Sequence, residues 1–237
     1  ELAIGGRCPG DQPDVDAVLI IDIDDYDEDP WLPDDELSTL KRVAISIIGL
    51  TTTGSWRIGA VTGGRWPTRV ADLSDGKADL VRHVLDVYQR DERHELANGI
   101  LAAAGLLQEQ ARPEAIAAVV VLANSTAIAQ AGLDEAIGAL GAAGIHVFAI
   151  GVGPRPDSES LRRIAGSDAR YYRNPTDVQV AEIVRGVEAA AAQTPGAQLL
   201  ASAVVTDIVP SNMRYIGGSG LPIEPGFDPA SRTLTWE

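Results

Sequence analysis

Carboxylates crowd the stretch from Asp22 to Asp29, which reads DIDDYDED. They directly follow an apolar run, Ala17 to Ile21, of the kind that forms a strand buried on both faces. Open α/β sheets bind their ligands at the carboxyl ends of such strands. Carboxylate oxygens at that place could hold a hard divalent cation such as Mg²⁺ or Ca²⁺, or one of them could act as a nucleophile.

The elements that must position these carboxylates alternate between strands and helices. This alternation predicts an α/β fold, a Rossmann-like three-layer sandwich whose central sheet is mostly parallel and covered by helices on both faces. We expect strands at 16–22, 56–62, 69–73, 117–122, 145–152 and 169–172, and helices at 36–50, 77–88, 96–110, 133–143, 159–165 and 177–192.

Three segments follow from changes in composition. Residues 1–15 are rich in Gly, Pro and Asp and predict a flexible lead-in, whereas 16–193 carry the α/β pattern. Residues 197–237 show strand signals at 199–209 and 232–236 but no helix signal, which predicts a β appendage. Because the chain begins with Glu1 and ends within an apparent strand, we expect a fragment of a larger bacterial protein with a truncated appendage.

Composition excludes several classes of partner. The net charge of −15 argues against nucleic acid, since phosphate binding needs clustered Lys and Arg. The sequence holds no apolar run of the roughly 20 residues that a membrane span needs, so we expect none in this fragment. The single cysteine, Cys8, cannot form an internal disulfide.

Five segments resemble a von Willebrand factor type A (vWA) domain in their order and spacing. They are VDAVLIIDID, WRIGAVT, HELANGILAA, AAVVVLANS and GIHVFAIGVG. The resemblance implies the vWA fold and a non-enzymatic role as a protein-interaction or adhesion module with an unidentified protein partner. It also implies a cell-surface or secreted location.

Many vWA domains bind Mg²⁺ at a metal-ion-dependent adhesion site (MIDAS) built from Asp-x-Ser-x-Ser, a later Thr and a late Asp. The resemblance places these five positions on Asp22, Asp24, Tyr26, His94 and Ser125, so only the first is retained. A tyrosine is too bulky to replace a serine ligand, and a histidine nitrogen is a poor ligand for Mg²⁺. We therefore predict a degenerate site without a standard cofactor on a binding face formed by these five residues. The alternative is a divalent cation, Mg²⁺ or Ca²⁺, held in altered geometry by Asp22, Asp24, His94 and Ser125.

An enzyme remains the alternative from another class. Asp22-x-Asp24 after a strand is similar to the haloacid dehalogenase-type phosphatases, in which the first Asp is the nucleophile and the second the acid/base. Those enzymes also need a late lysine for the phosphoryl charge, but both lysines here, Lys41 and Lys77, precede the strand that ends at Asn124-Ser125.

The appendage has a resemblance of its own. VVTDIVPSNMRYIGGSG and RTLTWE are similar to the start of a bacterial conserved-repeat β domain. That resemblance implies immunoglobulin-like strands in the appendage.

Overall fold

The computed structural model describes residues 14–22, 35–52, 55–87, 95–192, 205–208, 226–231 and 233–236. The chain divides into two compact units, one spanning Gly10–Gln193 and the other joining Glu1–Pro9 with Thr194–Glu237. Each unit is described by itself. The bounds 1–15, 16–193 and 197–237 remain predictions.

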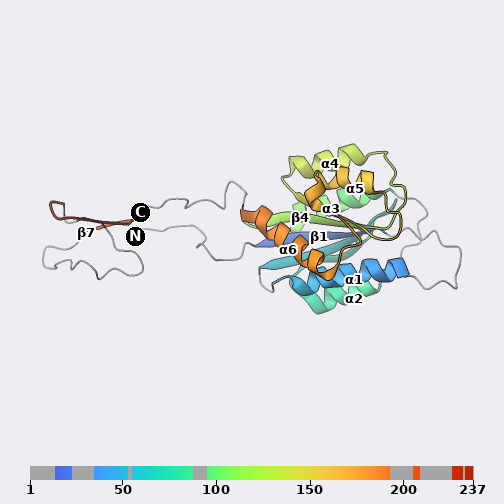
Figure 1. Cartoon of the computed structure of the whole chain (residues 1–237), viewed down its shortest axis with the longest axis horizontal. Helices are drawn as coiled ribbons and strands as arrows, with labels where there is room; N and C mark the ends of the chain where they lie inside the picture. The colour runs from blue at the N-terminus through green and yellow to red at the C-terminus, as the bar shows by residue number, and fades with distance from the viewer. Residues whose placement is uncertain are drawn as a thin grey trace. The chain divides into compact units, whose positions relative to one another are not determined.

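The larger unit alternates strands and helices along the chain (Figure 1). Its elements are β1 (Val15–Asp22), α1 (Asp35–Leu50), β2 (Trp56–Thr62), β3 (Arg69–Ser74), α2 (Lys77–Leu85), α3 (Leu96–Gln110), β4 (Ile116–Ala123), α4 (Leu133–Ala142), β5 (His146–Gly151), α5 (Ser158–Ala165), the 3₁₀ helix η1 (Asp168–Arg170), β6 (Tyr171–Arg173) and α6 (Asp177–Ala192).

The strands of this unit form a six-stranded sheet in the order β3-β2-β1-β4-β5-β6. Neighbouring strands run parallel except β3, which returns antiparallel to β2. Helices α1, α2 and α6 contribute to the core on one face of the sheet, and α3, α4 and α5 to the core on the other (Figure 1). The predicted three-layer α/β fold with a mostly parallel sheet is therefore confirmed.

Strand β1 lies at the centre of both cores. Alternate residues of a strand point to opposite faces. Leu19 and Ile21 accordingly join the core under α1 and α6, while Val18 and Ile20 join the core under α3. Both faces are covered, which explains why the apolar run is continuous rather than alternating with polar residues.

Strand β6 begins later than expected. A strand is predicted from residue 169, but the backbone turns through η1 and pairs with β5 only from Tyr171. Arg162 of α5 pairs with Asp168 of η1 at 3.1 Å and lies 5.0 Å from the Tyr171 ring centroid. These contacts from a neighbouring helix stabilise the turn. Local strand propensity does not include such contacts, so the predicted strand begins too early.

The appendage contains the short strands β7 (Val205–Ile208), β8 (Gly226–Asp228) and β9 (Thr233–Trp236), paired antiparallel in the order β7-β9-β8. The sequence predicts β7 and β9, whereas β8 lies in the Gly/Pro-rich segment between them. Asp228 closes the turn after β8 by accepting hydrogen bonds from the Ala230 N–H at 2.9 Å and the Ser231 hydroxyl at 2.5 Å. An Asp side chain that bonds two residues ahead is a turn signal, so β8 was detectable as the arm of a hairpin.

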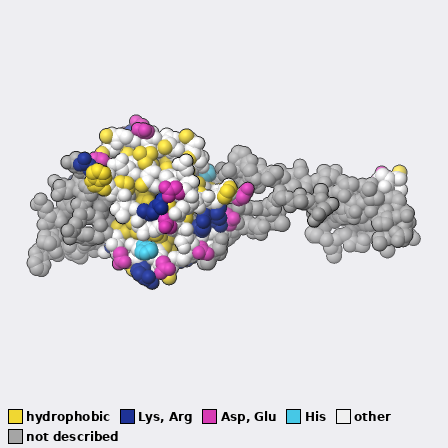
Figure 2. Space-filling view, turned by 180° about the vertical axis from the view of Figure 1, so that it is seen from behind, with side chains coloured by type: hydrophobic (Ala, Val, Ile, Leu, Met, Phe, Trp, Pro, Cys, Tyr) yellow, Lys and Arg dark blue, Asp and Glu magenta, His cyan; other side chains and the backbone are white. Residues whose placement is uncertain are grey.

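None of the helices within the described ranges is long and apolar enough to cross a membrane. Figure 2 shows acidic and basic side chains interspersed over one face of the larger unit. On that face the basic side chains are not gathered into the kind of patch that nucleic-acid binding needs.

Candidate functional site

Asp22 and Ser125 lie together at the carboxyl end of the central strands. Asp22 is the last residue of β1 and stands in register with Ala123 of β4, so Ser125 follows two residues beyond that partner. The Ser125 hydroxyl donates to Asp22 Oδ2 at 3.0 Å. The two residues are 1% and 0% exposed, respectively. The two residues therefore lie together, as the sequence predicts. They form a buried, hydrogen-bonded pair and are not exposed as ligands.

Two glycines allow close backbone packing next to Asp22. The Gly63 N–H, just after β2, donates to the Ile21 carbonyl at 3.0 Å. A Cβ at Gly63 would lie 2.2 Å from Asp22 Oδ1, and a Cβ at Gly99 of α3 would lie 2.9 Å from the Gly63 Cα. The end of β1, the turn after β2 and the first turn of α3 therefore pack directly against one another. The predicted site omitted both glycines, although glycine after a strand is a signal of close backbone approach.

The loop after β4 is held by the cap of α5. Asp157 donates its N–H to the Ser125 carbonyl at 2.8 Å. Its carboxylate accepts from the Ile128 N–H at 3.0 Å and from the Ser160 N–H at 3.1 Å. Burial alone would raise the pKa of Asp157, but these hydrogen bonds outweigh burial and lower the pKa. Asp157 is therefore the helix cap of α5, and it also positions Ser125.

The other predicted site residues, Asp24, Tyr26 and His94, lie outside the described residues. Glu95 precedes α3 directly, and its Oε2 accepts from the Asn98 side-chain amide at 3.0 Å. The structure thus brings together Asp22 and Ser125, while the remaining three positions stay predictions.

The part of the site that the structure describes does not fit a Mg²⁺ ion. Mg²⁺ requires six oxygens in a near-octahedral shell. The two predicted ligands that the structure describes, Asp22 and Ser125, are hydrogen-bonded to each other and buried. Across the described ranges there is no group of three or more His, Cys, Asp or Glu side chains that could hold a metal ion.

The comparison with protein families decides what this arrangement is. The family model for the von Willebrand factor type A domain matches residues 17–186. The chain belongs to this family. The match begins within β1 and ends within α6, so it includes residues of every strand of the six-stranded sheet.

Solved structures share the vWA fold at low sequence identity. Proximal thread matrix protein 1 from the mussel byssus is 18% identical with a TM-score of 0.61, over 83% of this chain and 50% of its own. BatB from Bacteroides thetaiotaomicron is 13% identical with a TM-score of 0.62, over 75% and 98%. The manganese-loaded TRAP protein of Plasmodium vivax is 15% identical with a TM-score of 0.59, over 75% and 74%.

Coverage of the mussel protein and the search of curated proteins complete the comparison. This chain spans about half the length of the mussel protein, one structure of which is described as having a zinc-occupied MIDAS motif. A search of curated proteins found no match.

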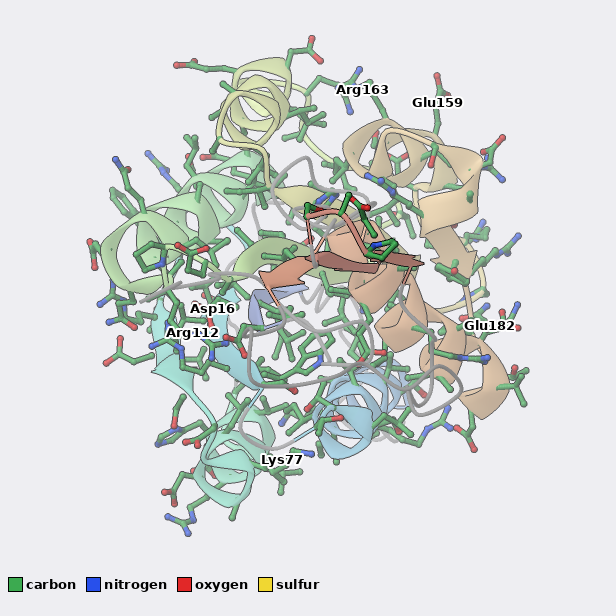
Figure 3. The ribbon with its side chains drawn as sticks, turned by 90° about the vertical axis from the view of Figure 1, so that its left-hand side faces the viewer. Asp16, Lys77, Arg112, Glu159, Arg163 and Glu182 are labelled. Carbon is green, nitrogen blue, oxygen red and sulfur yellow. The ribbon has the colours of Figure 1, made fainter. Side chains whose placement is uncertain are left out.

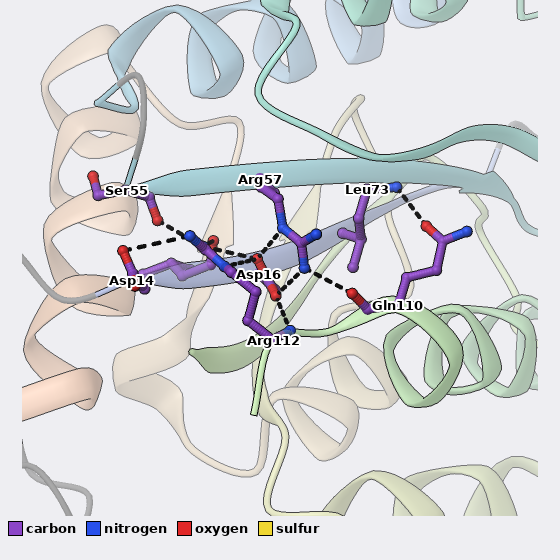
Figure 4. Close-up of polar contacts among 8 residues, drawn as sticks. Asp14, Asp16, Ser55, Arg57, Leu73, Gln110 and Arg112 are labelled. Carbon is purple, nitrogen blue, oxygen red and sulfur yellow. Dashed lines mark hydrogen bonds and ion pairs between the residues drawn. The ribbon is translucent and has the colours of Figure 1, made fainter. Parts of the chain in front are cut away.

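A second buried aspartate stands at the opposite end of β1 in this vWA domain. Figure 4 shows Asp16 between two arginines. Arg57 of β2 donates to both carboxylate oxygens, at 2.9 and 2.6 Å. Arg112, which follows α3, donates through its backbone N–H at 2.6 Å and its guanidinium at 3.1 Å. Figure 3 labels Asp16 and Arg112 side by side at this end of the sheet.

Together with Asp14, which pairs with Arg112 at 3.4 Å, the Asp16 cluster is a charge-balanced structural clamp. Burial alone would raise the pKa of Asp16, but the hydrogen bonds from Arg57 and Arg112 outweigh it, and the pKa lies below its ordinary value. Asp16 therefore stays ionised, and it ties β1 to β2 and to the segment that enters β4. No local sequence pattern identifies Asp16 as part of a cluster, because its partners are 41 and 96 residues away along the chain.

The two lysines donate hydrogen bonds to carbonyl oxygens at helix ends. Lys41 of α1 donates to the Leu85 carbonyl at 2.7 Å. Lys77 of α2 donates to the Gly49 carbonyl at 3.4 Å and to the Thr51 carbonyl. Each lysine thus binds carbonyls at the carboxyl terminus of the other helix, where a cation complements the helix dipole. Neither supplies the phosphate-binding lysine that the alternative phosphatase requires.

Proposed function

We propose that this vWA domain is a non-enzymatic protein-interaction module of an adhesion type. Its binding face lies at the carboxyl ends of the strands, where we place Asp22, Asp24, Tyr26, His94 and Ser125. We further propose that it belongs to a larger bacterial protein at the cell surface or in the secreted fraction. Family membership over 17–186 supports this proposal, together with a described strand end that offers no exposed catalytic group.

The buried hydrogen bond between Asp22 and Ser125 carries the proposal that the face works without the standard cation. The mussel and Plasmodium vivax proteins are described with zinc and manganese, respectively. Here the serine hydroxyl donates to the carboxylate that would be the first metal ligand, and both groups are shut off from solvent. The hydroxyl thus satisfies an oxygen that a cation would otherwise bind.

Calorimetric titration with Mg²⁺, Mn²⁺ and Ca²⁺ tests this proposal. We expect no saturable heat at millimolar metal, and no difference between the wild type and Asp22→Asn. Asp134→Asn, at an exposed position of α4, is the matched control for a lost carboxylate. Saturable binding that disappears in Asp22→Asn and persists in Asp134→Asn would show a working metal site.

Two further measurements test the absence of catalysis and the position of the face. Hydrolysis of an aryl phosphate should stay at the uncatalysed rate; activity that disappears in Asp22→Asn would identify a phosphatase. Cross-linking mass spectrometry on the parent protein should place intermolecular links at residues 63–68, 124–132 and 152–157, with or without a chelator. Links confined to the outer surfaces of α3 and α4 would refute the proposed face.

A further inference from the structure

Trp66 is the most exposed large hydrophobic residue in the described part of the chain, at 76%. It lies in the turn between β2 and β3, three residues beyond Gly63, which packs against Asp22. Because β1 and β2 are parallel, this turn emerges at the same edge of the sheet as Asp22. The exposed indole therefore belongs to the proposed binding face.

The turn that carries Trp66 is an ordered structure. Thr62 and Thr68 close its base through Thr62 N–H to the Thr68 carbonyl at 2.9 Å, and Thr68 N–H to the Thr62 hydroxyl at 2.8 Å. Gly64 takes a φ of +89°, which a residue with a side chain rarely adopts. The side-chain amide of Asn98 reaches from α3 to the Arg65 carbonyl at 3.2 Å. The indole is thus presented on a braced turn, which lowers the entropy cost of ordering it on binding.

Trp56 of the same unit is buried, in contrast to Trp66. Trp56, at the start of β2, is 3% exposed, and its indole N–H donates to Glu188 Oε1 at 3.2 Å. An indole buries about 150–250 Å² when it packs, and tryptophan is enriched among the residues that dominate interface energies. Exposing the apolar surface of the Trp66 indole to water is unfavourable for the free domain. A partner that covers the ring would remove this unfavourable free energy.

The chemistry around the ring selects a cationic partner. The Arg65 guanidinium already lies 5.4 Å from the ring centroid, so the indole binds a cation on one face, and its high exposure leaves much of the ring open. The chain carries a net charge of −15. Residues 23–34, which join the end of β1 to the start of α1, contain six acidic and no basic residues. The electrostatic potential of such an acidic chain attracts basic segments and repels acidic ones.

We propose that Trp66 is the anchor for a protein partner that presents a basic segment, with Lys or Arg placed next to an apolar side chain. The apolar side chain would cover the indole, and the cation would stack on the ring. This inference rests on the proposed interaction function and names the class of partner for the same face.

Fluorescence anisotropy of two short labelled peptides tests the proposal with the whole chain at low salt. One peptide consists of lysine, leucine and glycine; its counterpart has every lysine replaced by glutamate. We expect the lysine peptide to bind, Trp66→Ala to weaken it about tenfold, and added salt to weaken it further. Leu101→Ala, at another exposed apolar position, should bind as the wild type does. Arg65→Ala should bind at least as well, because it frees the second face of the ring.

Three results would overturn the proposal. They are equal binding by the wild type and Trp66→Ala, preference for the glutamate peptide, and concentration-dependent self-association of the chain that Trp66→Ala removes, which would identify a second copy as the occupant. The metal titration separates this failure from that of the proposed function. A metal-free domain that ignores the lysine peptide refutes only the basic partner, whereas saturable metal binding through Asp22 refutes the metal-free face.

Discussion

Each end of β1 buries an aspartate, but the two buried carboxylates are stabilised by different partners. Asp16 and Asp22 are six residues apart, so they point to the same face of the sheet, roughly 20 Å from each other. Asp16 is bound by two arginines, whereas the described side-chain bond to Asp22 comes from the neutral hydroxyl of Ser125. Neutralisation by opposite charges makes the amino end a fixed clamp, while at the carboxyl end the neutral Ser125 hydroxyl donates to the Asp22 carboxylate.

The contrast shows that burial alone does not indicate function. Both residues are almost fully buried. Asp16 precedes the apolar run Ala17–Ile21, and Asp22 follows it. What differs is the charge of their partners and the neighbouring surface, since the carboxyl end also carries the turn that exposes Trp66. Mutations at the amino end should therefore change stability, and those at the carboxyl end should change binding as well.

The largest expected effect is the loss of Arg57. Arg57→Ala leaves Asp16 buried with one of its two arginines, and breaking a buried ion pair is strongly destabilising. We expect the free energy of unfolding to fall by about 3 kcal/mol, as measured by urea denaturation. Arg82→Ala removes an exposed pair with Asp79 on α2 and is the control, with no measurable change expected. Equal stability of both variants would refute the clamp.

A methyl group at Gly63 should produce the next largest effect. The new Cβ of Gly63→Ala would collide with Asp22 Oδ1, so we expect a loss of about 2 kcal/mol in unfolding free energy. Gly138→Ala, in the middle of α4 with nothing within 4 Å of the added Cβ, should instead stabilise the domain by roughly 0.5–1 kcal/mol. Thermal denaturation of the two variants would show opposite shifts in Tm. A neutral Gly63→Ala would mean that the carboxyl end repacks easily.

Removal of the Ser125 hydroxyl should have a smaller effect. Ser125→Ala takes one hydrogen bond from a buried carboxylate, which should cost about 1.5 kcal/mol of unfolding free energy. Ser158→Ala, which removes a less buried hydroxyl that contacts Tyr171 at 2.7 Å, should cost less. The reverse order in urea denaturation would mean that the Asp22–Ser125 bond contributes little.

The pH dependence provides the finest distinction between the two ends. The folded-state pKa of Asp16 lies below the ordinary value of 3.8, so the unfolded state binds more protons as the pH falls through that range. The stability that ionised Asp16 contributes is complete above the unfolded-state pKa and is lost as the pH falls through the folded-state pKa. The stability gap between the wild type and Asp16→Asn should therefore be widest near about pH 7 and shrink below about pH 4.

Urea denaturation across that pH range measures this gap. Asp134→Asn, which alters an exposed carboxylate, should follow the wild type throughout. A gap for Asp16→Asn that stayed constant into acid would show that the ionisation of Asp16 does not support the fold.

Much of the fold was predictable because its signals are local. The bounds of β2 and α6 were predicted to the residue. The resemblance to vWA domains assigned Asp22 and Ser125 to one site, and a hydrogen bond joins them in the structure. Apolar runs buried on both faces of a sheet leave few arrangements for a chain of alternating strands and helices. Strand β8 was missed because strand propensity does not identify a three-residue strand within a Gly/Pro-rich segment.

The candidate site was predictable only in part. The position of the proposed face follows from the strand order, but the packing around Asp22 depends on Gly63, which approaches its carboxylate, and on Gly99, which approaches Gly63. The arginines around Asp16 likewise come from β2 and from the segment after α3. Such contacts depend on the register between strands far apart in the sequence, which local patterns do not encode.

The sequence by itself determined the three-layer α/β architecture, because hydrophobic periodicity acts over a few residues at a time. Only the tertiary structure decided that Asp16 binds two arginines while Asp22 binds a serine. It also decided that Trp56 is buried while Trp66, ten residues later, faces solvent. Residues of the same type thus acquire different roles, because their partners and exposure are set by elements that meet only when the chain has folded.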